Sequence, residues 1–433
     1  MTPHAPADGC PVSGRMPLIA ITGSRDPHPI YRHLRAEHGP VAPVTLEPGV
    51  PAWLVMGYDE IRQITEREPL FSRDARNWRD LNDGLVSPHS GLLPMMAYRP
   101  NVIGADQHEH RRLRKPLDDG VAHINHRTLR SEVQELCTEL VDGFVEQGRA
   151  DLVADFAAHV PMLAVARLFG LDSAQGHELR RALVALFGSQ DDSQAGNRSF
   201  EQILHDTLRR RRKHPTHDLT SQFLQHPDLR DDAEILQSMV VMISAGNETT
   251  TCWIAHTLYR MITDPGFDAR LRGGRLGVDE ALDEVLWREP PMTHMPARYA
   301  LRDTELGGRR IRRGDVLVLG LAAANSDPAV GTADQRPQGN RGHMAYSAGP
   351  HMCPARTTAR VITGTAVSTA LHLLPGLTLT TPAEDITWNP SPWTRCPAAL
   401  PVTFEEPHYR TSDPARRRRE RQDPCPTPPR CPT

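Results

Sequence analysis

The stretch EILQSMVVMISAGNETTTCWIAHTL (234–258) dominates the hydrophobic pattern of this 433-residue chain. It predicts a helix from about Asp232 to Ile262, which ends before Asp264-Pro265. At 1.5 Å per residue this helix is about 45 Å long, enough to cross a whole domain. Because its apolar residues fall on nearly every face, we expect it to be buried through the centre of the fold.

A polar interruption, SAGNETTT (244–251), lies at the middle of this helix. Glycine costs about 1 kcal/mol in a helix interior, and a buried unpaired carboxylate costs far more. Threonine hydroxyls can bond to the carbonyl four residues earlier and bend the helix, which would open a small polar pocket. There Glu248 and Thr249 could pass protons to a bound reactant. The alternative is a satisfied polar patch or a simple kink.

The segments on either side predict a mainly α fold with a minor β region. PVAPVTL (40–46) and AWLVMG (52–57) indicate a hairpin, 298–322 an antiparallel unit, and 376–404 short strands. The stretch 72–106 has no period, and a loop of that length is usually functional. Apolar residues at i, i+3, i+4 spacing predict further helices near 58–67, 107–119, 127–147, 151–169, 175–188, 198–212, 278–288 and 356–373.

Composition excludes several classes of protein. No run of about 18 uncharged apolar residues could span a membrane, and a net charge of −3 does not indicate nucleic acid. The seven cysteines are scattered without a C-x-x-C pair, which argues against a disulfide framework and a zinc site. No secretory signal opens the chain, so a cytoplasmic location is expected. We expect mobile ends at 1–25 and at the Arg/Pro-rich 407–433, around a single domain at 26–406.

Two further segments carry chemistry. Cys353 lies between a Gly-Pro turn and a predicted helix, whose amides and positive dipole end would lower its pKa and favour the thiolate that a metal ligand or nucleophile needs. The alternative is a buried structural cysteine. In 107–117, His110 and Arg114 share one helix face and could hold an anion, although such a charged run is usually a solvated face.

Together these motifs resemble those of the haem-thiolate monooxygenases, the cytochrome P450 superfamily, in its bacterial, actinobacterial-type form. The family's haem loop is an aromatic residue, two residues, Gly, three residues and Cys, which matches Tyr346 to Cys353. The Ala-Gly-x-Glu-Thr-Thr of its central helix matches 245–250, and 325–328 and 400–404 are further local matches. The resemblance runs from about Pro29 to Phe404. It implies the cytochrome P450 fold, with the long central helix over a haem.

The resemblance also assigns residues to roles. Cys353 would be the axial thiolate ligand of the iron in haem b, iron protoporphyrin IX. Glu248 and Thr249 would be the acid–alcohol pair that supplies protons. The two haem propionates would be bound by His110, Arg114, Arg298 and His351, and the remaining haem-binding residues would be Ala245, Gly246, Tyr346 and Gly349.

The activity implied is insertion of one oxygen atom from O2 into a small apolar or natural-product substrate of secondary metabolism, by hydroxylation or epoxidation. The sequence has no flavin or iron–sulfur signature, so separate redox proteins are needed, and the resemblance implies a ferredoxin and a ferredoxin reductase. The chain is expected to act as a monomer. The alternative is a haem-binding protein without turnover, such as a sensor, a carrier or a partner protein. The pocket walls would be 72–106, 175–200, Val241, 292–297 and the turn at Pro392-Trp393, where Trp393 could equally be core.

One family hallmark is altered. Members carry Glu-x-x-Arg on the helix before a Pro-Pro pair, together with a second Arg in the irregular passage that follows, but here Glu284-Val-Leu-Trp287 puts a tryptophan in the place of the first Arg. Arg288 could pair with Glu284 at i, i+4, and Arg336 or Arg341 could be the remaining partner. A few actinobacterial-type members share the tryptophan, so we expect a subfamily trait.

Overall fold

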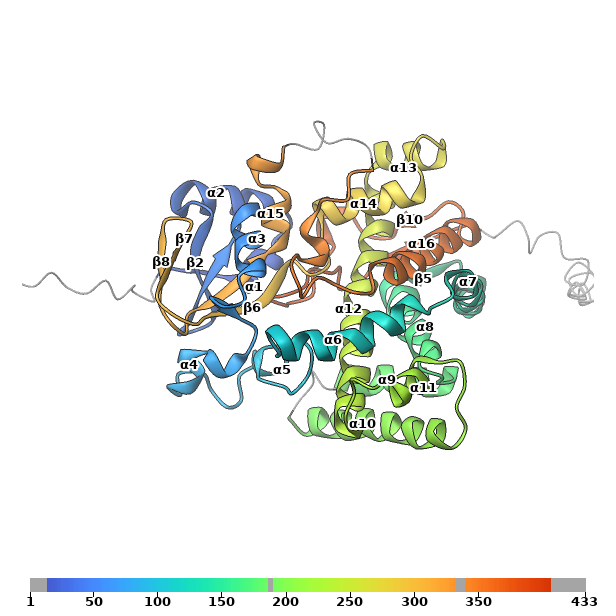
Figure 1. Ribbon diagram of the computed structural model, residues 1–433. Coiled ribbons are helices and arrows are strands. Elements are labelled where there is room, and N and C mark those ends of the chain that lie inside the picture. Colours follow the sequence, from blue (N-terminus) through green and yellow to red (C-terminus); the bar gives the residue numbers. More distant parts are fainter. Residues whose placement is uncertain (1–13, 186–189, 332–338, 406–433) are drawn as a thin grey trace, which may run out of the picture.

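The protein is described here by a computed structural model, which covers residues 14–185, 190–331 and 339–405. A helical body carries a smaller β region at one side (Figure 1). The predicted mainly α fold with a minor β region is therefore confirmed. The helices are α1 (Leu18–Thr22), α2 (His28–His38), α3 (Tyr58–Glu66), α4 (Arg79–Asn82), α5 (Leu93–Met96), α6 (Gln107–Ala122), α7 (His126–Asp142), α8 (Val160–Leu168), α9 (Ser173–Ala185), α10 (Gln190–Lys213), α11 (Leu219–Gln225), α12 (Asp232–Thr263), α13 (Pro265–Arg272), α14 (Val278–Arg288), α15 (Leu321–Asn325) and α16 (Arg356–Leu373).

The strands form three small sheets. In the largest, the order is β1-β2-β3-β9-β6-β4, and the predicted hairpin is its antiparallel pair β2–β3. The other two have the orders β10-β11-β5 and β7-β8. The strands are β1 (Met16–Pro17), β2 (Val41–Glu47), β3 (Val50–Val55), β4 (Phe71–Ser72), β5 (Arg149–Asp151), β6 (His294–Ala300), β7 (Thr304–Leu306), β8 (Arg309–Ile311), β9 (Val316–Gly320), β10 (Thr378–Leu379) and β11 (Pro401–Thr403).

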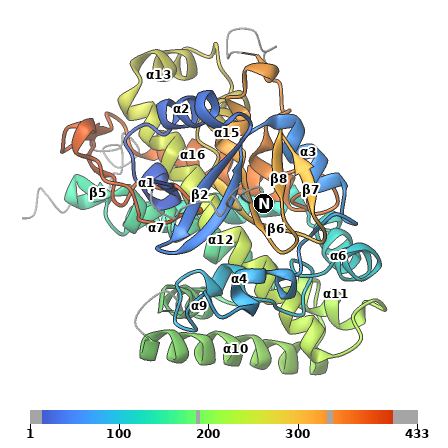
Figure 2. The same ribbon diagram turned by 90° about the vertical axis from the view of Figure 1, so that its left-hand side faces the viewer.

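The predicted central helix is α12, which crosses the molecule between α10 at one end and α13 at the other (Figures 1 and 2). It begins where the Asp231 side chain accepts a hydrogen bond from the Glu234 amide, and it ends at Asp264, whose carboxylate caps α13. Cys252, Trp253 and Leu258 lie on its buried second half, at the centre of the largest apolar core. This core holds α12 against α8, α14 and α16.

Three predictions about elements need correction. Part of the N-terminal segment expected to be mobile is folded, because Leu18 and Ile21 of α1 are fully buried in the core of the sheet region. The helix expected at 151–169 is divided at His159 into a π-helix (Leu152–Ala157) and α8. The loop at 72–106 contains the short helices α4 and α5. The expected tail at 407–433 lies outside the described residues, as does Arg336.

Among the described helices, none has the length and apolar character that a membrane span needs.

Candidate active site

The Cys353 loop is fixed by tight backbone contacts. The Cys353 amide donates a hydrogen bond to the Tyr346 carbonyl over 3.1 Å, and α16 begins three residues later at Arg356. Gly349 has a positive φ of 70°, and a Cβ there would lie 2.4 Å from the Thr65 carbonyl oxygen. Only glycine therefore fits at this turn. Tyr346 packs edge-on against Trp253 of α12, with ring centroids 6.2 Å apart.

The pKa of the Cys353 thiol differs from the expectation. Burial raises it, and this effect outweighs the lowering by the Ala355 amide, Arg114 and Arg356. The start of α16 acts in the predicted direction, but the net shift is upward because the sulfur is desolvated. A thiolate at this position needs a further positive charge at the sulfur, which a coordinated metal cation would supply.

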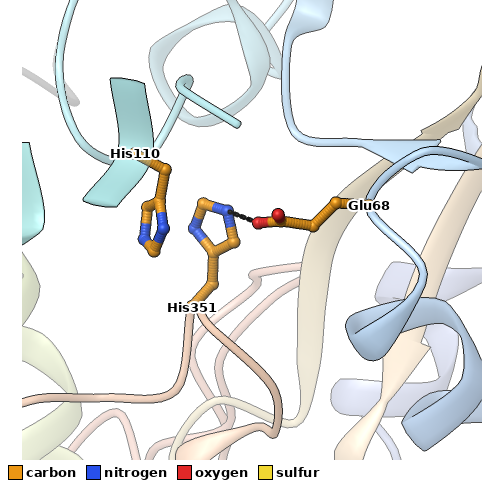
Figure 3. A group of neighbouring side chains, drawn as sticks. All are labelled: Glu68, His110 and His351. Atoms are coloured by element: carbon orange, nitrogen blue, oxygen red, sulfur yellow. Dashed lines mark ion pairs between the residues drawn. The ribbon is translucent and has the colours of Figure 1, made fainter. Parts of the chain in front are cut away.

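A buried histidine pair lies beside this loop. The ring centroids of His110, on α6, and His351 lie 3.8 Å apart with the rings tilted by 33°, and Glu68 approaches His351 Nε2 to 3.7 Å (Figure 3). These three side chains bring possible ligand atoms within 4.8 Å of one another. Neither ring nitrogen of the buried His110, nor Nε2 of His351, has a hydrogen-bond partner among the described residues.

Arginines surround the histidine pair. Arg298 is buried on β6, and its Nη2 has no hydrogen-bond partner in the part of the chain that the structure describes. Arg114 donates to the Pro350 carbonyl over 3.0 Å, which ties α6 to the Cys353 loop. Burial, together with the charges of Arg114 and Arg298, lowers the pKa of His110 to about 4. Burial likewise lowers the pKa of His351, and Arg298 adds to that shift.

This cluster fits an anionic group. Several buried donors converge without an acceptor, and buried polar groups normally have a partner. The two propionates of a haem supply oxygen acceptors and negative charge, and Cys353 lies two residues from His351. The residues present therefore fit the predicted cofactor. All four predicted propionate-binding residues belong to this region, which we call the propionate cluster: His110, Arg114, Arg298 and His351.

No local sequence pattern pointed to two residues of this region, Glu68 and Arg73. Arg73 donates to the Pro296 and Ala297 carbonyls over 2.6 and 3.2 Å, and its charge acts on Arg298 and His351. It stands directly after β4, which pairs with β6. That pairing joins residues more than 220 apart along the chain, so no local pattern could reveal it.

The polar interruption of α12 forms part of an accessible face. Ala245 and Glu248 are exposed, although the helix is buried on either side of them. Thr249 Oγ1 donates to the Ala245 carbonyl over 2.9 Å, as predicted. The expected buried carboxylate is instead exposed, and Glu248 Oε1 accepts a hydrogen bond of 2.6 Å from Thr394. At Gly246 a Cβ would meet Val165 only at an ordinary 3.7 Å, so packing does not require glycine there.

Some of the segments expected to form the walls of the substrate pocket contact one another. Met292 and Thr394 form a β-bridge, and the His294 amide donates to the Trp393 carbonyl over 2.9 Å. Trp393 is buried in the core of the sheet region, which favours its core interpretation. Asn101, from the 72–106 loop, donates to Gln237 of α12 over 3.2 Å.

The prediction of a Glu284–Arg288 pair is wrong. Glu284 forms two hydrogen bonds of 2.7 Å with Arg270 and lies 3.4 Å from Arg260. Arg288 is exposed. The two side chains do not pair because Glu284 faces arginines of α12 and α13, whereas Arg288 lies at the solvent-facing end of α14.

Comparison with known proteins agrees with this geometry. No protein-family model matches the chain. It is 30% identical to cytochrome P450 monooxygenase PikC of Streptomyces venezuelae over 390 residues, which cover 88% of this chain and 91% of PikC. It is also 30% identical to mycinamicin IV hydroxylase/epoxidase of Micromonospora griseorubida over 388 residues, covering 85% and 93% of the two chains.

The fold matches solved structures as well. CYP154A1 from Streptomyces coelicolor A3(2) superposes with a TM-score of 0.76 at 28% identity, over 88% of this chain and 98% of that one. The predicted cytochrome P450 fold is thus confirmed. By its sequence identity to PikC, its fold and its cysteine loop, this chain belongs to the cytochrome P450 superfamily of monooxygenases.

Proposed function

We propose that this monooxygenase holds haem b through Cys353 and the propionate cluster, and oxidises a small apolar natural product. The observation that carries the proposal is the set of buried nitrogens on His110, His351 and Arg298 that have no hydrogen-bond partner among the described residues. His351 of this set is two residues from Cys353, whose thiolate needs a cation. A structural role for Cys353 alone does not account for those nitrogens.

When bound, a thiolate-ligated haem supplies the activation of O2. The protein supplies the protons. Glu248 is a carboxyl group with solvent access, and Thr249 is a hydroxyl one residue further along the same accessible face of α12. The Thr249 hydroxyl is held by the Ala245 carbonyl, so its lone pairs are directed away from that carbonyl, where they can accept a proton passed on from Glu248.

The surface supports an apolar substrate. Most of the exposed large apolar side chains among the described residues belong to segments proposed as pocket walls. Four lie in the 72–106 loop and one on α9. They are Leu85, Met95, Tyr98, Ile103 and Val184. Hydroxylation or epoxidation is the reaction proposed, in line with the name of the mycinamicin IV relative.

We propose a ferredoxin and a ferredoxin reductase as the electron donors, because the sequence has no flavin or iron–sulfur signature of its own. The monomeric state, the cytoplasmic location, the single domain and the mobile C-terminal tail remain predictions.

An absorption spectrum of the reduced protein with carbon monoxide tests the haem assignment. The wild type should show the strongly red-shifted Soret band of a thiolate-ligated haem, and Cys353→Ala should lose it. A wild type without the band, or a variant that keeps it, would overturn the assignment.

Turnover is tested with surrogate redox partners and a panel of apolar natural products. A substrate-induced spin shift with coupled use of reductant and formation of an oxygenated product is expected. Tight haem binding with neither response would support the non-catalytic alternative instead.

A further inference from the structure

Asp283, on α14, is a buried carboxylate surrounded by basic side chains. Its side chain is 4% exposed. Arg341 Nε donates to Oδ2 over 3.1 Å, Arg360 forms an ion pair with Oδ1, and His343 Nε2 lies 3.8 Å from Oδ1. An isolated carboxylate would not be stable here, so these contacts are the reason that the charge can be buried.

The partners of Asp283 flank the Cys353 loop on both sides. Arg341 and His343 lie five and three residues before Tyr346, where the loop begins. Arg360 follows Cys353 by seven residues and lies on α16. One carboxylate on α14 therefore holds the two ends of the segment that carries the proposed iron ligand.

Neighbouring contacts strengthen the same connection. Trp287 Nε1 donates to the Asn340 carbonyl over 2.8 Å, and its ring packs edge-on against His343. Asn325 donates to the Leu286 carbonyl over 2.9 Å and accepts from the Met344 amide over 2.7 Å. The tryptophan that replaces the family's arginine is thus itself a hydrogen-bond donor to the segment that leads into the loop.

Glu284, at the position of the family's paired glutamate, faces elsewhere. Its partners Arg270 and Arg260 lie on α13 and α12, and neither belongs to the Cys353 loop. Consecutive residues of a helix point about 100° apart. Asp283 therefore contacts the segments around the Cys353 loop from a different face of α14 than the one on which Glu284 lies.

We propose that Asp283, and not Glu284, is the positioning residue for the haem loop, acting through Arg341, His343 and Arg360. The proposal rests on the proposed role of Cys353 as haem ligand. The charged form of Asp283 is consistent with it: burial alone would raise the pKa of this carboxyl, but His343, Arg360 and Arg341 together lower it.

Two adjacent isosteric substitutions, Asp283→Asn and Glu284→Gln, test the proposal in the haem-loaded protein. Each removes one carboxylate charge from α14. The readouts are the rate of haem transfer to an apoglobin acceptor and the fraction of the carbon monoxide complex that keeps the red-shifted Soret band. We expect Asp283→Asn to release haem at least roughly tenfold faster and to lose much of the band, since its partners lose their hydrogen bonds to a charged group. Glu284→Gln should stay within about twofold of the wild type.

Equal effects of the two substitutions, or a larger effect of Glu284→Gln, would overturn the proposal. If Asp283→Asn does not fold, Arg341→Gln decides, because this side chain is 58% exposed and its loss leaves no buried gap. It should speed haem release, whereas the exposed Arg310→Gln should not, and equal rates for these two variants would also overturn the proposal. A wild type without the band would instead refute the haem assignment, and the proposal with it.

Discussion

Thr394 Oγ1 donates a hydrogen bond of 2.6 Å to Glu248 Oε1, across 146 residues of sequence. Thr394 also lies 3.1 Å from the Ser391 hydroxyl and forms a β-bridge with Met292. The proposed proton donor on α12 is therefore held by a turn that belongs to the proposed substrate wall. The position of the carboxylate depends on the position of that turn.

Thr394→Val removes this hydrogen bond and keeps the shape of the side chain. We expect the fraction of reductant electrons recovered in product to fall several-fold, since the carboxylate loses an interaction worth about 1.5–3 kcal/mol. Peroxide release should rise in parallel, and Thr394→Ser should restore coupling. Haem content and the carbon monoxide spectrum serve as controls and should not change. Coupling in Thr394→Val equal to that of the wild type would show that the bond has no part in proton delivery.

Glu248→Gln removes the proposed acid itself. General acid catalysis by a positioned side chain contributes roughly 10²–10⁴-fold, so product formation should fall by at least about 100-fold. The solvent isotope effect on turnover should increase at the same time, because proton delivery becomes slower. Glu305→Gln, at an exposed position on β7, is the control and should have the activity of the wild type. An active Glu248→Gln would assign proton delivery to another group.

The central helix and the cysteine loop could be predicted because their signals are local. The apolar run of α12 and the spacing from Tyr346 to Cys353 lie within single segments, and both appear in the structure. The polar interruption was also informative, since Thr249 bonds to Ala245 within one helical turn. Its carboxylate was expected to be buried, however, and sequence alone did not reveal that this face of α12 is accessible.

Other parts of the site depend on contacts between distant segments. Arg73 acts on the propionate cluster because β4 pairs with β6, and Thr394 reaches Glu248 because its turn packs on α12. The choice between Asp283 and Glu284 depends on which face of α14 meets the loop, and in the sequence Glu284, not Asp283, has a basic residue at i+4, Arg288. These relationships follow from tertiary packing, which no local pattern specifies.

Arg298→Met tests the propionate cluster. Methionine fills similar volume without the buried charge, and burial already lowers the pKa of Arg298. We expect haem transfer to an apoglobin to be at least roughly tenfold faster, from the loss of a charged hydrogen bond. The haem-free chain should be no less stable to urea, because the guanidinium Nη2 has no partner there. Arg111→Met, at an exposed position, is the control. Unchanged haem transfer in Arg298→Met would place the propionates elsewhere.

His294 predicts a pH dependence of stability away from the haem. It is fully buried, its Nε2 lies 2.9 Å from the Tyr31 hydroxyl, and burial lowers its pKa to about 4. Because the folded pKa is below the unfolded value of 6.5, the stabilisation is present above that value and is lost as pH falls toward 4. Between about pH 7.5 and about pH 5.5, this residue should account for about 1.3 kcal/mol of lost unfolding free energy.

The measurement is urea unfolding at the two pH values for the wild type and for His294→Gln. The variant should lose about 1.3 kcal/mol less than the wild type over this interval, since glutamine does not titrate. Equal losses of unfolding free energy in the wild type and in His294→Gln would mean that burial does not keep His294 neutral.

Arg395 joins the late turn to the N-terminal segment. Its side chain is 1% exposed, pairs with Glu289 over 3.0 Å and donates to the Arg25 and Ser24 carbonyls over 2.7 and 3.0 Å. Removing one partner of a buried ion pair costs about 3–5 kcal/mol, so Arg395→Met should lower the unfolding free energy by that amount. Arg310→Met is the matched control: its ion pair with Asp303 is 79% exposed on the arginine side, so the loss should be below about 1 kcal/mol.

The same substitution should loosen a defined part of the chain. Because Arg395 holds the backbone just after α1, amide hydrogen exchange across 18–25 should accelerate in Arg395→Met more than in the core of α12. Adding Glu289→Gln should recover part of the lost stability, since it removes the carboxylate left without its partner. If the two arginine variants were equally stable, or if Glu289→Gln only added to the damage, the buried pair would not be what holds the N-terminal segment to the turn.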